Sequence, residues 1–206
     1  MVAKRQLPAG ACRLAEEAAR GRQARLVAGD RRRLAGRRKK GGSQVARTLR
    51  GRPGSRFHLV VDAGGLPLEL LLSAGNENEQ RYLLPLLDLL AERKIEPSEL
   101  HADRGYYSRR HEEALARRGI HSRISRPRRR GEPIPVAAST RVAWRGKKRR
   151  LKTLDPSAGE RWQIERTNAW LKGFRRIETR RDRKAENYRA FCQLGMTIIL
   201  LRALLR

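Results

Sequence analysis

The chain has 206 residues, of which 49 are Lys or Arg and 21 are Asp or Glu, so its formal net charge is +28 at pH 7. This length predicts one domain, and a hydrophobic fraction of 39% argues against a wholly disordered tail. A charge of this size is tolerated when the partner is a polyanion, so the composition indicates a nucleic acid partner. Two distant cysteines cannot form a disulfide framework, which fits a reducing cytosol. With a nucleic acid as the partner, we expect a cytoplasmic, nucleoid-associated protein. The longest apolar stretch is too short to span a bilayer, so we expect no membrane partner.

Basic residues are concentrated in two parts of the chain, residues 1–55 and 123–152, whereas residues 57–122 carry nearly balanced charges. We therefore expect the central part to be the packed body. The Ala- and Arg-rich residues 1–25 predict a weak helix. Residues 31–55 and 125–153 lack periodicity and are rich in Gly, Pro or Arg, so they are predicted to be basic loops that lie along phosphate groups.

Short apolar runs predict the strands. The run from Phe57 to Asp62 is typical of a buried strand, and Gly64-Gly65 turns the chain back into a hairpin partner at 68–72. Leu100 to Asp103 and Ile120 to Ile124 are also predicted strands.

Helices are predicted from spacing and capping residues. Leu83, Leu86, Leu87 and Leu90 lie on one helix face. Further helices are expected from Ser108 to Arg118, from Asp155-Pro156 to about Gly173, and from Ala185 to Leu205. Strands alternating with helices, with an early hairpin, predict an α/β domain with a mixed sheet.

Two acids differ in placement from the charge-balancing majority. Asp103 ends a predicted strand, and carboxylates at strand ends point into the crevice where α/β sheets bind ligands. Glu165 lies within a predicted helix, where Arg161, Glu165 and Lys172 fall within about 40° of one another. The spacing alone favours an ordinary ion pair between Arg161 and Glu165, worth about 0.3–0.5 kcal/mol. Trp162 and Trp170 on the same helix are expected to be core residues rather than base-stacking groups.

Carboxylates suit DNA chemistry for a specific reason. Phosphodiester cleavage needs an activated oxygen nucleophile and neutralisation of the developing charge, and two metal ions about 3.5–4 Å apart supply both. Mg²⁺ prefers carboxylates and water, so two or three acids from separate elements suffice to hold such a pair.

Three stretches resemble bacterial insertion-sequence transposases with a DDE catalytic domain. They are FHLVVDAGGLPLELLLSAGNENEQRYLLPLLDLL (57–90), LHADRGYYSRRHEEALARRGI (100–120) and RWQIERTNAWLKGFRRIETRRDRKAENYRAF (161–191). The third keeps the family's R-x3-E-x6-K pattern. The resemblance covers roughly residues 26–206, which we expect to form the catalytic domain, with 1–25 as a separate N-terminal segment and 125–153 as a basic loop inserted before the third acidic helix. An N-terminal recognition region of the family is largely missing, so we expect a shortened or partly degenerate copy.

The resemblance implies an RNase H-like fold and a DDE-type enzyme that cuts double-stranded DNA at transposon ends and joins it to target DNA. The second and third catalytic acids would be Asp103 and Glu165. Arg161 and Lys172 would contact DNA, together with the nearby Arg166, Arg175 and Arg176. The implied cofactor is a pair of Mg²⁺ ions held by the three acids, for which Mn²⁺ can substitute. The implied assembly is a homo-oligomer on DNA.

The first acid has two candidates. The resemblance places it at the end of a strand well before Phe57, and Asp30, which follows the apolar run LVAG, is the acid in that region. Asp62 is the alternative, although it aligns better with a turn after the second strand. We therefore expect Asp30 as the first catalytic and metal-binding acid.

Two other functions remain open. The chain could be a catalytically inactive remnant that only binds nucleic acid, which composition alone slightly favours. It could also be an RNase H-like nuclease, against which the R-x3-E-x6-K pattern and the last helix argue. Convergence of three acids on one site would separate an enzyme from a binding protein.

Overall fold

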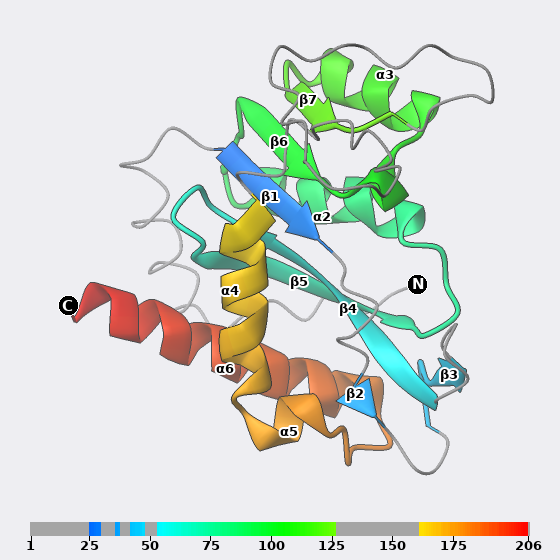
Figure 1. Ribbon diagram of the computed structural model, residues 1–206, viewed down its shortest axis with the longest axis vertical. Helices are drawn as coiled ribbons and strands as arrows, with labels where there is room; N and C mark the ends of the chain where they lie inside the picture. The colour runs from blue at the N-terminus through cyan, green and yellow to red at the C-terminus, as the bar shows by residue number, and fades with distance from the viewer. Residues whose placement is uncertain (1–24, 30–35, 38–41, 48–52, 127–160, 206) are drawn as a thin grey trace, which may run out of the picture.

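A computed structural model describes residues 25–29, 36–37, 42–47, 53–126 and 161–205, and shows a mixed sheet with helices on both of its faces (Figure 1). The prediction of a mixed α/β fold is therefore confirmed. None of the helices in these described ranges is long and apolar enough to cross a membrane.

Within the described residues, seven strands form one sheet. Its main path runs β2-β4-β1-β6-β7, and both β3 and β5 also pair with β4. The central strand β4 is antiparallel to β1 and to β5, whereas β1, β6 and β7 run parallel to one another. The strands are β1 (Arg25–Gly29), β2 (Gly36–Arg37), β3 (Ala46–Arg47), β4 (Pro53–Val61), β5 (Pro67–Ala74), β6 (Glu99–Ala102) and β7 (His121–Ile124).

The predicted hairpin is formed by β4 and β5. In its turn, the Asp62 carboxylate accepts a hydrogen bond from the Leu66 N–H at 2.7 Å, and the Asp62 N–H donates to the Leu66 carbonyl at 3.0 Å. Gly65 has a φ of +80°, a conformation that glycine adopts without steric cost. The apolar run and the Gly-Gly pair therefore predicted this element correctly.

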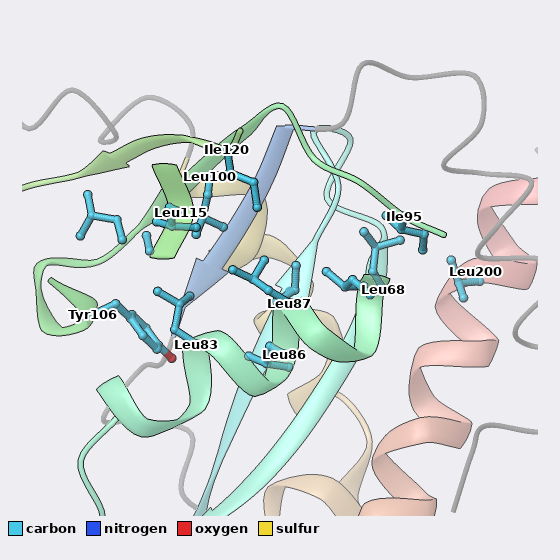
Figure 2. Close-up of a cluster of buried hydrophobic side chains, with 14 residues drawn as sticks. Leu68, Leu83, Leu86, Leu87, Ile95, Leu100, Tyr106, Leu115, Ile120 and Leu200 are labelled. Atoms are coloured by element: carbon cyan, nitrogen blue, oxygen red, sulfur yellow. The ribbon is translucent and has the colours of Figure 1, made fainter. Parts of the chain in front are cut away.

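One face of the sheet is covered by α2 (Gln80–Glu92), with α3 (Arg109–Arg117) packed beside it (Figure 2). The four leucines predicted to share a helix face are all buried here, at Leu83, Leu86, Leu87 and Leu90. Burial of each such side chain contributes about 1.5–3 kcal/mol. The Ser108 side chain caps α3 by accepting a hydrogen bond from the His111 N–H at 3.1 Å, as the sequence predicts.

The opposite face is covered by α4 (Arg161–Lys172), α5 (Arg175–Glu178) and α6 (Ala185–Leu204). Helix α6 approaches its neighbours closely at Gly195, where an added Cβ would lie 2.7 Å from Ile177 Cδ1 and 3.3 Å from Leu171 Cδ2. Along one side of α6, the side chains of Tyr188, Cys192, Met196 and Ile199 are buried.

A buried arginine joins the end of α5 to the sheet. Arg180 is 1% exposed, and its guanidinium donates to the carbonyls of Ser43 at 2.8 Å and Asp182 at 3.0 Å and to the hydroxyl of Ser55. It also lies over the Tyr188 ring, with Cζ 5.1 Å from the centroid. This residue therefore connects three separate segments of the chain.

Two expectations are wrong. Residues 31–55 are not simply a loop, because β2, β3 and the start of β4 lie among them. Trp162 and Trp170 are not core residues, since they are 51% and 41% exposed. The face of α4 that packs on the sheet is made by Ile164, Thr167 and Leu171, and at about 100° per residue both tryptophans lie outside that face.

Other expectations fall outside the described residues. These are the N-terminal helix before residue 25, the basic loop from residue 127 onward, and the helix start at Asp155-Pro156.

Candidate active site

Asp103 lies at the edge of the sheet where the parallel strands end. It follows β6 directly, and β6 pairs with β1 through Ala28 and Ala102 and with β7 through Ala102 and Ile124. The Asp103 carboxylate accepts a hydrogen bond from the Arg104 N–H at 2.8 Å and so begins the 3-10 turn η1 (Arg104–Tyr106). Asp103 is exposed at this edge, which is where open α/β sheets bind ligands.

Asp30 follows the last residue of β1 in the sequence, but it lies outside the described residues. The structure describes β1 as far as Gly29 and places that strand beside β6 in parallel register. The strand that precedes Asp30 and the strand that precedes Asp103 therefore end at the same edge of the sheet.

Asp62, the alternative first acid, lies at the opposite edge. Strand β4 runs antiparallel to β1, with Val61 paired to Val27. Asp62, the next residue after β4, therefore lies beside the start of β1. It is 3% exposed, and its carboxylate closes the β4–β5 turn.

Glu165 is an exposed residue of α4, the helix that packs against β1 and β4. This helix is held to the β4–β5 turn by Thr167, whose hydroxyl bonds to the Gly65 carbonyl. Helix α4, which carries Glu165, crosses β1 (Figure 1). Strand β1 is the neighbour of β6, and β6 ends at Asp103.

Within the described residues, no three Asp, Glu, His or Cys side chains are arranged so that they could hold a metal ion. The described part supplies two candidate oxygen ligands, Asp103 and Glu165, on separate elements. The third candidate, Asp30, lies outside the described residues.

The candidate DNA-contacting residues differ in their surroundings. Arg175 and Arg176 are exposed, and Arg176 pairs with Asp182 at 3.0 Å. Lys172 is half-buried at the end of α4, whereas the side chain of Arg161 is outside the described set. The Arg166 guanidinium lies between the rings of Trp162 and Trp170.

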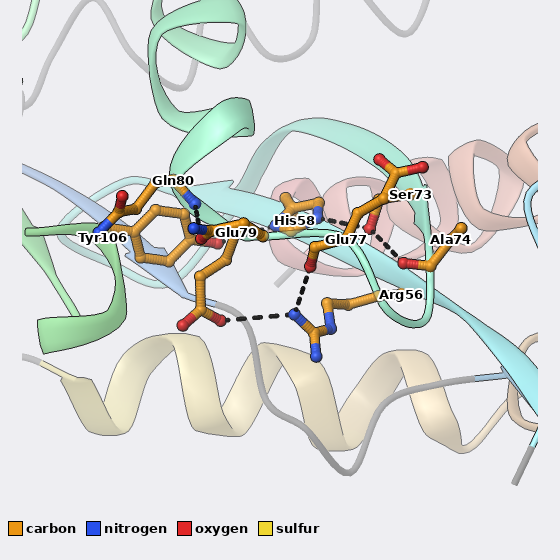
Figure 3. A network of polar contacts seen from close by, with 9 residues as sticks. Arg56, His58, Ser73, Ala74, Glu77, Glu79, Gln80 and Tyr106 are labelled. Carbon is orange, nitrogen blue, oxygen red and sulfur yellow. Dashed lines mark hydrogen bonds and ion pairs between the residues drawn. The ribbon is translucent and has the colours of Figure 1, made fainter. Parts of the chain in front are cut away.

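A buried polar network supports the turn that follows Asp103 (Figure 3). His58 of β4 is 0% exposed, with Nδ1 3.0 Å from the Tyr106 hydroxyl and Nε2 2.9 Å from Ser73 Oγ. Because the Ser73 hydroxyl donates to the Ala74 carbonyl at 3.2 Å, it accepts from Nε2–H, and Nδ1 accepts from Tyr106. His58 therefore joins β4 and β5 to η1, a role that its sequence position gave no reason to expect.

A second contact to the same turn comes from an ion pair. The Arg56 guanidinium lies 3.7 Å from the Glu79 carboxylate and donates to the Glu77 carbonyl at 3.1 Å (Figure 3). The Glu79 carboxylate lies directly against Gly105, where an added Cβ would be 1.8 Å from Oε1. Gly105 is two residues from Asp103, so this contact requires a residue without a side chain beside the candidate acid.

The buried histidine predicts a pH dependence of stability. Burial, with the Arg56 cation as a smaller cause, lowers the pKa of His58 from 6.5 to about 3. Between pH 7 and pH 5 the unfolded chain takes up a proton at this residue and the folded chain does not, so the free energy of unfolding falls by about 2 kcal/mol as the pH falls. We expect His58→Gln to remove this part of the pH dependence, measured by urea unfolding at both pH values. His121→Gln, at an exposed histidine, is the control; an equal fall in His58→Gln and wild type would contradict the assignment.

Comparison with known proteins gives two matches. The family model described as "Transposase DDE domain" matches residues 21–201. A protein of Burkholderia cepacia named "Putative transposase for insertion sequence element IS402" is 37% identical over 166 residues, which cover 77% of this chain and 68% of that protein.

Proposed function

The chain belongs to the family of transposases with a DDE domain, and from that premise we propose that it cuts DNA at transposon ends and transfers the cut strand to target DNA. As a member of this family it is an enzyme of DNA transposition. Domains of this family generally use divalent metal ions.

The proposed fold is RNase H-like, over residues 26–206. Its support is the order of the five longer strands, β5-β4-β1-β6-β7, with β4 antiparallel to the other four. Helices cover both faces of this sheet, and β1 and β6 end side by side, with Asp103 directly after β6.

The single observation that carries the proposal is the position of Asp103. It stands at the end of β6, beside β1, and α4 with Glu165 crosses β1 on one face of the sheet. Because α4 is anchored to the β4–β5 turn beside Glu165, the approach of the Glu165 carboxylate to Asp103 when metal and DNA bind is part of the proposal.

The residues proposed to hold Mg²⁺ are Asp103, Glu165 and Asp30, because carboxylate oxygens are the ligands that this ion prefers. Two bound ions would activate the attacking oxygen and stabilise the leaving oxygen. The acids fix the position of the scissile phosphate, while Arg161, Lys172 and Arg175 would hold the DNA backbone. Two transposon ends need two active sites, so a homo-oligomer on DNA is part of the proposal, as is a nucleoid location.

A joining reaction tests this function. A duplex carrying one element end is incubated with the protein, Mg²⁺ and a supercoiled plasmid, and joined molecules are detected on a gel. We expect joining with a 3′-hydroxyl end and none with a 3′-dideoxy end, because the hydroxyl is the nucleophile. Binding of the end without any cutting or joining would instead support a protein that only binds DNA.

The basic residues on α4 make a separate prediction. Each phosphate contact releases counterions, so Arg161→Ala and Lys172→Ala should each weaken DNA binding and reduce the slope of log K against log salt by about 1. The measurement is anisotropy of a labelled duplex from 50 to 200 mM salt. Arg117→Ala, at an exposed position of α3, is the control. Unchanged slopes in both α4 variants would show that these residues do not contact phosphate.

A further inference from the structure

We propose that Trp162, Arg166 and Trp170 of α4 form a platform on which unpaired bases of single-stranded DNA stack, beside the candidate acid Glu165. This inference rests on the proposed function, since it assigns a place for the strand that is separated near the cut. The three residues are called the tryptophan platform below.

The platform is a ladder of three flat groups along one side of the helix. Its members are spaced at i, i+4 and i+8, so each lies about one turn, roughly 6 Å, beyond the one before. The Arg166 guanidinium lies between the two indoles, with Cζ 4.6 Å from the Trp162 centroid and 4.8 Å from the Trp170 centroid. Both distances are within the range of a cation–π contact.

The tryptophan platform is anchored to the β4–β5 turn through Arg166. Arg166 Nη2 donates a hydrogen bond to the Gly64 carbonyl in the β4–β5 turn, and an added Cβ at Gly65 would lie 2.6 Å from the same nitrogen. The guanidinium is therefore fixed against the sheet, and it in turn fixes the two rings. A preformed aromatic surface loses little conformational entropy when a ligand stacks on it.

The rings are exposed although they are large and apolar. Trp162 is 51% exposed and Trp170 is 41% exposed, whereas Ile164 and Leu171 of the same helix are buried. With the guanidinium between the indoles and about half of each tryptophan exposed, the platform assigns one further planar group to each indole. The platform therefore has places for about two bases rather than for a continuous stack.

The chemistry of the surface selects the ligand. Aromatic rings bind nucleobases by stacking, whatever the base, and basic residues attract the strand that carries them. Bases in a duplex are already stacked on their neighbours, so only unpaired bases can offer a face. A second copy of the chain is a poor occupant, because each copy carries a net charge of +28.

The position beside Glu165 gives the platform a use in the proposed reaction. Trp162 is three residues before Glu165 on the helix, so the two side chains are neighbours on its surface. Unpaired bases next to a phosphate held at Glu165 would then lie within reach of the rings.

The test compares two single strands that differ only in their bases. Fluorescence anisotropy measures binding of an oligothymidylate and of an abasic strand of equal length, at one salt concentration, to the full chain. We expect wild type to bind the thymidylate about 5- to 100-fold more tightly. The double variant Trp162→Ala/Trp170→Ala should bind both strands equally, with the affinity that wild type shows for the abasic strand.

Two further variants complete the design. Trp162→Leu/Trp170→Leu keeps apolar bulk without a ring and gives the same test if the alanine pair does not fold. Leu194→Ala, at a leucine of α6 that is 55% exposed, should behave as wild type. Wild type that binds both strands equally, or a leucine pair that still prefers the thymidylate, would overturn the platform.

The platform and the proposed function can fail separately. Wild type that cuts duplex ends with Mg²⁺ but does not distinguish the two strands would overturn the platform alone. Wild type that prefers the thymidylate but does not cut duplex ends would support the platform and contradict the proposed function.

Discussion

Asp103→Asn is expected to reduce Mg²⁺-dependent cleavage of element-end DNA by more than about 100-fold while DNA binding stays near the wild-type level. The fold should tolerate the change. The Asp103 carboxylate begins η1 by accepting the Arg104 N–H, and an asparagine side chain accepts that hydrogen bond equally well. What the variant loses is the negative charge at the edge where β1 and β6 end, and with it the ligand for a hard cation.

The measurement is the initial rate of strand cutting, beside anisotropy of the same labelled duplex. Asp88→Asn is the matched control, because Asp88 is an exposed acid of α2 whose partner is Arg118 at 2.7 Å. Cutting by Asp103→Asn at the rate of the Asp88 control would remove Asp103 from the catalytic residues.

Arg180→Met is expected to lower the free energy of unfolding by about 3–5 kcal/mol. Arg180 is almost fully buried, and it donates to groups from three segments: Ser43 before β3, Ser55 of β4 and Asp182 before α6. Methionine fills much of the volume but leaves those acceptors without their donor. It also removes the cation that lies over the Tyr188 ring.

Urea unfolding of three proteins checks this prediction. Arg181→Met makes the same chemical change one residue further on, at an exposed position, and should stay within about 0.5 kcal/mol of wild type. Arg180→Lys keeps the charge but not the fork of donors, so it should lie between the two. Equal stabilities for Arg180→Met and Arg181→Met would contradict the structural role.

Much of the fold follows from local patterns. The hairpin at β4 and β5, the leucine face of α2 and the Ser108 cap of α3 each depend on residues within about twenty positions of one another. Such local contacts leave recognisable patterns of spacing, turn residues and capping side chains, so the sequence predicts these elements.

Contacts between distant segments were not predictable in the same way. The start of β4 is polar, and Ser55 and Arg56 are buried because Arg180 and Glu79 reach them from far along the chain. His58 has its partners 15 and 48 residues away, and no spacing indicates them.

The prediction of Trp162 and Trp170 as core residues is wrong because it rests on their hydrophobicity and not on their angular position around the helix. Ile164 lies about 200° from Trp162 around the helix, so the two cannot share a buried face. The same angular reasoning that grouped Glu165 with Arg161 and Lys172 would have placed the tryptophans outside the core. The roles of Asp30, Asp103 and Glu165 stay predictions.

We propose that this chain cuts DNA with a divalent metal ion held by Asp30, Asp103 and Glu165. The most direct measurement is strand cutting of a duplex with element ends by wild type and by Glu165→Gln, each with Mg²⁺ and with a chelator. We expect cutting, with 3′-hydroxyl products, by wild type in Mg²⁺ alone. Equal cutting by Glu165→Gln, or binding by both proteins without metal-dependent cutting, would contradict it.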